Sequence, residues 1–473
     1  MSITDRPNVL LIYTDQWRGD ALGCAGHPDV QTPHLDALAA RGVRFAKHFV
    51  QNPVCMPSRV SMLSGRYPSN LGILQMAVPV PEDLPCVQHL MRRAGYTTAN
   101  LGKLHFLPHS NRDHREPHPP YGFDLVEISD EPGPYDDAYR AFVRRTQPDQ
   151  LDASSAHVFP PMAKVFRDET GFDDGVRHPE AWAPWTTVAF SGDENATYSA
   201  FVGTRTIDTI RRYAKSGEDF FCIASFYSPH SPLVAPQKFL DLYDPAAFTL
   251  PEFPPEREEE RLDAGLDDET IRQAMHGYFA MISEVDHWIG RIVETLESTD
   301  MADDTLIVFT SDHGEFLGEH GRWGKWYPAP DCVSRVPLIV AGPGVTTGVC
   351  DGIVESVDIV PTLLEWVGVP QPAFMDGESL GPALRGEAFA GKPGALIEDA
   401  MPGFAWRGWR TNTHRYLLHD DGRERLFDLH AEFGEYRDVA DAPDQHEALL
   451  EHRHALATRM IQATHCHTPV WPY

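Results

Sequence analysis

Three short apolar runs in this chain end in polar side chains that can carry chemistry, and this pattern constrains the fold most. The runs are residues 8–13, 220–226 and 305–309. Runs of this length are typical of strands that are buried on both faces, as in the parallel sheet of an α/β protein. Such sheets place ligand-binding residues at the carboxyl ends of their strands. The side chains that follow the three runs are Asp15, Gln16, His230, Asp312 and His313.

The pattern therefore predicts an α/β fold with a site at one edge of its sheet. A fourth strand, over residues 97–101, is expected to lead into Lys103 and His105. Alternate residues of a strand point the same way, so these two cations could face one anion site. Each side chain also has a simpler role open to it. Lys103 and His105 could be solvated surface groups, His230 a core or surface histidine, and Asp15 a cap of the following turn.

Residues 52–66 form the stretch with the most specific chemistry. Its Cys55-Met56-Pro57-Ser58-Arg59 sequence predicts a loop that enters a helix, with Pro57 in the first turn and Ser58 as a cap. The helix N-terminus would favour an anion beside Cys55. Cys55 could instead be a small buried hydrophobic residue. A phosphatase-type thiolate would need an arginine at position 61, where Ser61 stands.

Length and charge limit the domain organisation and the partners. A chain of 473 residues exceeds what one core usually serves, so one large domain and a smaller one are expected. The formal net charge of −29 repels nucleic acids and anionic membranes, so neither is an expected partner. No run of 18 apolar residues occurs, residues 1–7 lack signal-peptide features, and the seven cysteines are scattered. We therefore expect a cytoplasmic protein in a reducing compartment.

The motifs in chain order resemble those of the formylglycine-dependent (type I) sulfatases. Cys-x-Pro-Ser-Arg at 55–59 is followed by Leu-Ser-Gly-Arg at 63–66, Gly-Lys-x-His at 102–105 and a later lysine, Lys325. The resemblance covers nearly the whole chain, and only residues 107–195 have no counterpart in it. It implies the alkaline phosphatase superfamily fold, in which a mixed, largely parallel sheet lies between helices.

The resemblance also implies a division of the chain. A catalytic domain is expected over residues 1–385 and a small α+β subdomain, with an antiparallel sheet and a helix, over 386–473. Residues 107–195 are rich in Pro, Asp, His and aromatic residues and show no long periodic element. Long irregular segments of this kind often cover a functional site. We expect an irregular insertion over the site there.

The activity implied is hydrolysis of a sulfate monoester, a small-molecule substrate, to an alcohol and sulfate. In the family, a maturation enzyme oxidises the signature cysteine, here Cys55, to Cα-formylglycine. One hydroxyl of the hydrated aldehyde attacks sulfur, and ionisation of the other expels sulfate. Either His230 or Lys325 would protonate the leaving oxygen, and His105 would act as the base. The catalytic residues implied by the resemblance are Cys55, Arg59, Lys103, His105, His230 and Lys325.

A divalent metal ion is the second cofactor that the resemblance implies. Its ligands would be Asp15, Gln16, Asp312 and His313. Oxygen donors with one imidazole suit Ca²⁺ or Mn²⁺. The family usually has a second Asp where this chain has Gln16, a departure that is reminiscent of the phosphonate monoester hydrolase branch.

Three other functions compete with the sulfatase. A phosphonate monoester or phosphodiester hydrolase would use the same machinery, although that branch tends to carry neutral residues in place of Lys103 and His105. A non-catalytic anion-binding protein would be expected to lack Cys55, Arg59 or a metal ligand, and this chain keeps them all. A thiol enzyme would use unmodified Cys55. The motifs leave the oligomeric state open, and a homo-oligomer is one of the states allowed.

Overall fold

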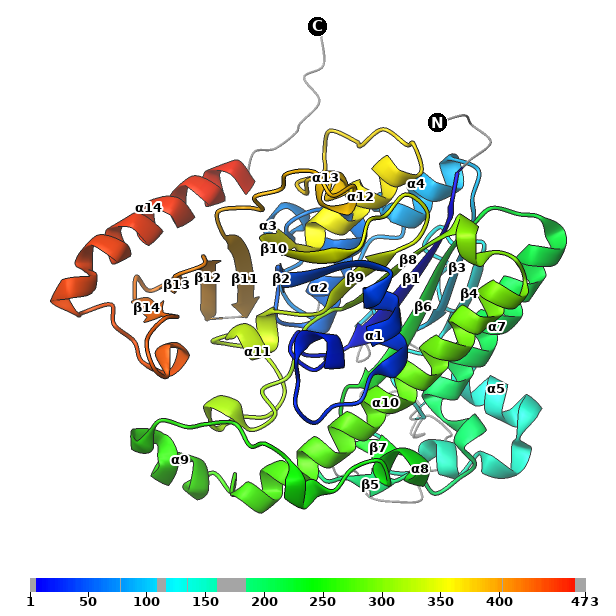
Figure 1. Cartoon of the computed structure of the whole chain (residues 1–473), viewed down its shortest axis with the longest axis horizontal. Helices are drawn as coiled ribbons and strands as arrows, with labels where there is room; N and C mark the ends of the chain where they lie inside the picture. The colour runs from blue at the N-terminus through cyan, green and yellow to red at the C-terminus, as the bar shows by residue number, and fades with distance from the viewer. Residues whose placement is uncertain are drawn as a thin grey trace, which may run out of the picture.

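A single sheet of eight strands organises the computed structural model (Figure 1). The structure describes residues 6–76, 78–108, 116–133, 135–159, 184–401 and 403–463. In spatial order the strands are β10 (Gly348–Glu355), β2 (Gly42–Phe49), β9 (Leu338–Ala341), β8 (Thr305–Ser311), β1 (Asn8–Asp15), β6 (Phe220–Pro229), β3 (Thr97–Gly102) and β4 (Leu125–Ile128). Every neighbouring pair is parallel except the two that involve β9. The mixed, largely parallel sheet is confirmed.

The four central strands, β8, β1, β6 and β3, are parallel neighbours, so their carboxyl ends meet at one edge. Leu11 of β1 pairs with Ile223 on one side and Val308 on the other. Every residue of β1, β6 and β8 is buried, which explains why the sequence shows continuous apolar runs at these places. The predicted strands therefore deliver their polar ends to a common region.

The sheet lies between two helical layers because side chains alternate across each strand. Leu10 and Ile12 of β1 pack into one hydrophobic cluster, whereas Val9, Leu11 and Tyr13 pack into the other. The first cluster is covered by α1 (Pro33–Ala40), α7 (Tyr198–Ser216) and α10 (Asp268–Ser298). The second is covered by α2 (Cys55–Ser64), α4 (Val87–Arg93) and α12 (Ile359–Trp366). No helix in the described part of the chain is both long and apolar enough to span a bilayer.

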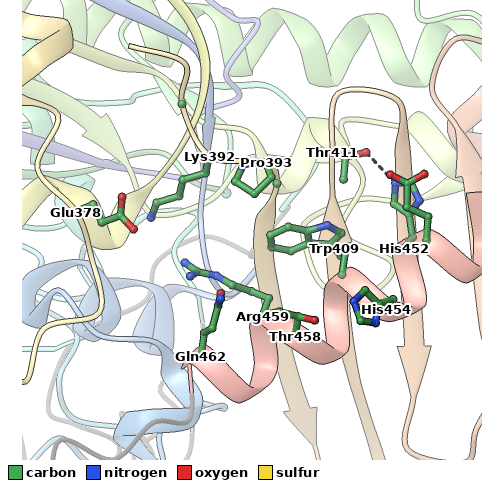
Figure 2. Close-up of a pocket in the computed structure, with 14 residues that line it drawn as sticks. Glu378, Lys392, Pro393, Trp409, Thr411, His452, His454, Thr458, Arg459 and Gln462 are labelled. Carbon is green, nitrogen blue, oxygen red and sulfur yellow. Dashed lines mark hydrogen bonds between the residues drawn. The ribbon is translucent and has the colours of Figure 1, made fainter. Parts of the chain in front are cut away.

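A separate antiparallel sheet follows near the C-terminus. Its strands are β11 (Ala395–Met401), β12 (Phe404–Arg410), β13 (His414–His419) and β14 (Glu424–Asp428). The last helix, α14 (His446–Ala463), packs Leu449 and Leu456 against Trp409 and Tyr416 of this sheet. Between them lies a cavity of about 480 Å³ lined by Trp409, Thr411, His452 and Arg459, among others (Figure 2). The predicted small sheet with a helix is confirmed.

Buried ion pairs tie this C-terminal part to the main sheet. Lys392 Nζ lies 2.6 Å from Glu355 Oε2 and 2.6 Å from Asp358 Oδ1. Arg459 of α14 lies 3.1 Å from the same Glu355 carboxylate at the end of β10. Burial alone would raise the pKa of Glu355, but Lys392 and Arg459 hold it below its usual value. The predicted division at residue 385 follows α13 (Gly381–Leu384), and as a domain boundary it stays a prediction.

The predicted irregular region, 107–195, contains more regular structure than expected. Its described residues include β4, which joins the main sheet, and α5 (Ala138–Thr146). Asp137 caps α5, and Phe142 and Val143 pack into the core. β4 has only four residues and α5 nine, so neither is a long element. Residues 109–115, 134 and 160–183 of this region lie outside the described residues.

Candidate active site

The helix α2 begins at Cys55, and every one of its residues is buried. The predicted helix N-terminus beside Cys55 is therefore confirmed. The capping role predicted for Ser58 is wrong, because Val54 occupies the N-cap position and Ser58 lies inside the helix. The Ser58 hydroxyl instead donates a hydrogen bond of 2.5 Å to the Asp312 carbonyl oxygen. This bond ties the cysteine helix to the end of β8.

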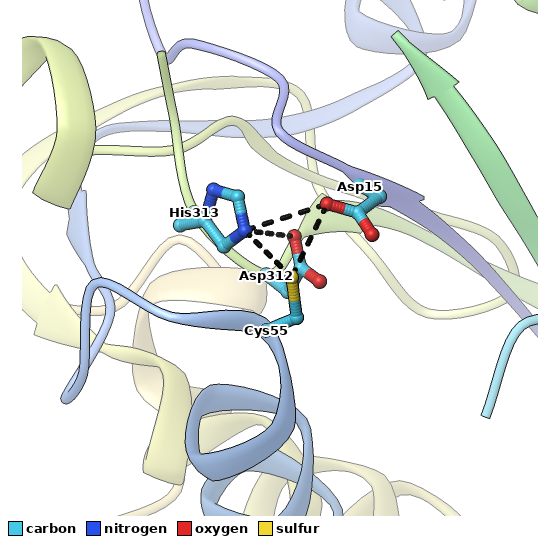
Figure 3. Close-up of side chains that lie close together, drawn as sticks. All are labelled: Asp15, Cys55, Asp312 and His313. Atoms are coloured by element: carbon cyan, nitrogen blue, oxygen red, sulfur yellow. Dashed lines mark hydrogen bonds and ion pairs between the residues drawn. The ribbon is translucent and has the colours of Figure 1, made fainter. Parts of the chain in front are cut away.

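The Cys55 sulfur lies among side chains from three other segments, and Figure 3 shows Asp15, Asp312 and His313 around it. Its Sγ is 2.7 Å from Lys325 Nζ, 3.1 Å from His313 Nε2 and 3.8 Å from Asp15 Oδ1. Burial and Asp15 raise the pKa of the Cys55 thiol to about 11, although Lys325 and Lys103 act in the opposite direction. The chain thus holds the thiol form of Cys55 at the meeting point of a carboxylate, an imidazole and an ammonium group.

A cluster of metal-ligating atoms surrounds the same point. One ligand atom each from Asp15, Cys55, Asp312 and His313 lies within 4.8 Å of the others, and all four residues are buried. His313 Nε2 is 3.4 Å from Asp15 Oδ1 and 3.7 Å from Asp312 Oδ1. Two buried carboxylates and an imidazole fit a divalent cation that accepts mainly oxygen donors.

The His313 ring is held in the form that a metal site requires. Its Nδ1 lies 2.9 Å from the Gly314 carbonyl oxygen, a contact in which only a protonated Nδ1 can donate. Burial and Lys325 lower the pKa of His313 to about 4, so the ring is neutral near pH 7. Nε2 therefore presents its lone pair to the cluster, where Lys325 Nζ lies 3.1 Å away.

Gln16 lies directly beside this cluster. Its backbone N–H donates a 3.1 Å hydrogen bond to Asp312 Oδ1, and its carbonyl accepts a 2.7 Å bond from the Tyr278 hydroxyl. These bonds accompany a left-handed backbone conformation, with φ 68°. The side-chain Nε2 donates to Glu315. The structure therefore places Gln16 next to the other three predicted metal ligands.

Two buried cations hold the carboxylates. Arg59 Nε donates a 2.7 Å bond to Asp312 Oδ2, and Arg59 is only 1% exposed. Lys103 Nζ lies 2.5 Å from Asp15 Oδ2. Burial would raise the pKa of Asp15, but nearby basic side chains, Lys103 foremost, hold it well below its usual value. Asp15 is therefore kept ionised, and this is the state that binds a cation.

Lys325 contacts His230 as well as Cys55. Lys325 Nζ is 3.1 Å from His230 Nε2, while His230 Nδ1 lies 2.7 Å from the Ser231 carbonyl oxygen. The Phe159 ring contacts the His230 ring, with 5.9 Å between centroids. Phe159 belongs to the region predicted to cover the site, so its described part does reach a predicted catalytic residue.

Lys103 and His105 do not alternate along a strand as predicted, because β3 ends at Gly102. His105 adopts a left-handed conformation with φ 56°. Asp130 Oδ1 accepts hydrogen bonds from the backbone N–H groups of Leu104 and His105, at 2.9 and 2.7 Å. The structure thus brings Lys103 into contact with Asp15 and holds His105, also buried, in the adjoining loop.

Several supporting side chains were not predicted to have a role. Ser225 Oγ accepts a 3.0 Å hydrogen bond from Arg59, and Tyr278 supports the Gln16 backbone. Glu315 accepts from the Gln16 side chain. Each of these contacts joins residues more than 160 positions apart in the chain. No local pattern in the sequence marks such partners.

Comparison with known proteins identifies the family. The family model described as Sulfatase matches residues 7–369. An ulvan-active sulfatase from Formosa agariphila is 28% identical, over 89% of this chain and 75% of that protein. The choline-sulfatase of Rhizobium meliloti is 29% identical, over 93% and 83% of the two chains. The solved structure of the phosphonate monoester hydrolase SpPMH from Silicibacter pomeroyi has a TM-score of 0.80 and 28% identity, over 97% of this chain and 96% of that chain.

The family match spans all the residues of the cluster around Cys55, and the structural likeness extends over nearly the whole chain. The chain belongs to the sulfatase family, within the alkaline phosphatase superfamily.

Proposed function

We propose that this protein hydrolyses sulfate monoesters to an alcohol and inorganic sulfate, with a formylglycine made from Cys55 as the nucleophilic group. One observation carries the proposal. Cys55 begins a buried helix, and its Sγ lies within 3.1 Å of both Lys325 and His313. The formylglycine hydrate supplies an attacking hydroxyl and a second hydroxyl whose ionisation releases sulfate. Membership of the sulfatase family supports a hydrolase that acts on sulfuric esters.

We further propose that Asp15, Gln16, Asp312 and His313 hold one divalent ion, either Ca²⁺ or Mn²⁺. The buried donor set of carboxylate oxygens and one neutral imidazole suits these ions. When bound, the ion would polarise the ester oxygens and lower the pKa of the attacking hydroxyl. Arg59 would fix the direction of the Asp312 carboxylate through its 2.7 Å bond.

The remaining cations would recognise the ester anion and move protons. Lys103 and Lys325 would neutralise the ester oxygens that do not react. This local positive charge is needed because the chain as a whole carries −29. Lys325 Nζ and His230 Nε2, 3.1 Å apart, can share the proton that the leaving oxygen takes up. His105 is proposed as the base.

The maturation enzyme would act before the chain folds. Cys55 is only 1% exposed, and Met56 and Val60 of its helix pack into the second of the two hydrophobic clusters that flank the main sheet. A modifying enzyme needs access to the Cβ and sulfur of Cys55, and this packing denies access. We therefore propose that Cys55 is oxidised in the unfolded or nascent chain.

A phosphonate monoester or phosphodiester hydrolase is the second candidate. Gln16 beside Asp312 and His313 favours it, as does the likeness to SpPMH. The contact between Lys103 and Asp15 favours the sulfatase, because it adds a cation at the carboxylate that neighbours Cys55.

Side-by-side kinetics on an aryl sulfate and an aryl phosphonate monoester distinguish the two candidates. We expect the higher kcat/KM for the sulfate. A phosphonate preference above about a hundredfold, equivalent to ~2.7 kcal/mol of transition-state discrimination, would reverse the assignment. Cys55→Ala protein prepared in parallel is the control, because activity that survives this change comes from a contaminant.

A further inference from the structure

One buried carboxylate, Glu315, links the predicted metal ligands to the loop that carries Lys325. Glu315 is 0% exposed. Its Oε2 accepts a hydrogen bond from Gln16 Nε2. Its Oε1 accepts bonds from the backbone N–H groups of Leu317, at 2.8 Å, and Gly324, at 2.5 Å. None of the catalytic or metal-binding roles proposed for this site falls to Glu315.

We propose that Glu315 is a positioning residue that turns the Gln16 carboxamide so that its oxygen, and not its nitrogen, is presented to the metal ion. This inference rests on the proposed metal site of the sulfatase. A carboxamide carries a donor on one side of its Cγ–Cδ axis and an acceptor on the other. An ionised carboxylate can only accept, and the hydrogen bond from Gln16 Nε2 to Glu315 Oε2 holds the Gln16 nitrogen on the side of Glu315. The oxygen is left on the opposite side.

Two hydrogen bonds fix the backbone of Gln16. Its N–H is bonded to Asp312 Oδ1, and its carbonyl accepts from Tyr278. Both bonds hold the residue at the edge of the ligand cluster in a left-handed conformation. Rotation of the carboxamide about its last bond therefore decides which atom is offered. Ca²⁺ and Mn²⁺ take amide oxygen as a ligand.

Glu315 also explains why an amide fits position 16 better than a second acid. An aspartate or glutamate there would place two buried carboxylates against each other, and such pairs repel strongly. Gln16 and Glu315 are thus matched as donor and acceptor. Because Gly324 precedes Lys325, the other oxygen of Glu315 also steadies the loop whose Lys325 Nζ lies 2.7 Å from Cys55 Sγ.

Mn²⁺ binding by full-length, metal-depleted Glu315→Gln protein tests the proposal. The new amide keeps an oxygen for the Leu317 and Gly324 N–H groups, so the loop contacts survive. Its nitrogen can donate to Gln16, which turns the Gln16 nitrogen toward the metal. We expect the Mn²⁺ dissociation constant, measured by titration of the free-ion EPR signal, to rise at least about tenfold.

Glu284→Gln is the matched control, because Glu284 is also buried but bonds to Thr197 and Ser199. We expect it to bind Mn²⁺ as the wild type does.

The exchanged pair, Gln16→Glu with Glu315→Gln, separates orientation from general damage. Exchange restores one donor facing one acceptor and again offers oxygen to the metal. We expect the double variant to bind Mn²⁺ within about twofold of wild type or more tightly, whereas each single variant binds more weakly. The proposal would be overturned if the losses of Mn²⁺ affinity in the two single variants multiplied in the double variant. It would also be overturned if folded Glu315→Gln bound Mn²⁺ with wild-type affinity. Substrate is absent from these titrations, so their outcome is independent of the choice between sulfate and phosphonate esters.

Discussion

Cys55→Ser protein is expected to complete at most one turnover and to accumulate a stable adduct ~80 Da heavier than the unreacted chain. The serine hydroxyl stands where the sulfur stood, at the start of α2 and within reach of Lys325 and His313. It can attack a sulfate ester as the proposed hydrated aldehyde would. It has no second hydroxyl whose ionisation expels sulfate, so the reaction stops at the sulfated enzyme.

Cys55→Ala supplies the comparison, because it should give neither turnover nor adduct. Cys350→Ser is a matched control for replacement of a thiol, since Cys350 is a half-buried free cysteine on β10. We expect wild-type turnover from it. All three variants are measured by intact-mass spectrometry after incubation with an aryl sulfate. Sustained turnover by Cys55→Ser at near the wild-type rate would show that an ordinary alcohol suffices.

Removal of the metal is expected to have a comparable effect. Chelation should reduce turnover by ~10³-fold or more, because several kcal/mol of charge stabilisation are lost together with activation of the nucleophile. Mn²⁺ or Ca²⁺ should restore activity better than Zn²⁺, since the donors are mainly oxygens with one imidazole. The fold should survive, because Lys103 and Arg59 remain paired with Asp15 and Asp312.

The measurement combines steady-state rates with elemental analysis of the same sample and a thermal melt to verify folding. Re-addition of each ion at equal free concentration tests the order of the metals. Full activity in a sample that contains no stoichiometric metal would remove the ion from the mechanism. Restoration by Zn²⁺ alone would instead mean that the ligand set is misassigned.

The strand ends were predictable because two physical constraints act on neighbouring residues. A strand buried on both faces must be apolar throughout, and the residue after it lies at the sheet edge where ligands bind. Residues 8–13 and 305–309 show both features, and the structure places Asp15 and Asp312 in one cluster. The family motifs added Cys55, and the structure brings its sulfur to that cluster.

The parts that could not be predicted depend on contacts that are distant in the sequence. Serine is a common helix cap, but the helix begins before Ser58, so Val54 occupies the N-cap position. The Ser58 hydroxyl instead donates a hydrogen bond to the Asp312 carbonyl oxygen. His105 lies beyond the end of β3, so the alternation of a strand does not apply to it. The small antiparallel sheet was predicted without strand bounds, and alternation could not supply those of β11, because its first five residues are all buried. The pairing of Glu315 with Gln16 becomes visible only when both strand ends are in place.

The most direct test of the central claim is the mass of the peptide that carries position 55, measured on the same preparations whose turnover is measured. Preparations made with and without a co-expressed maturation enzyme should differ in the fraction of this peptide that is ~18 Da lighter than the cysteine form, the change from thiol to aldehyde. We predict that kcat rises in proportion to that fraction and extrapolates to zero when only the thiol is present. Full turnover by a preparation in which position 55 is entirely unmodified cysteine would contradict the account.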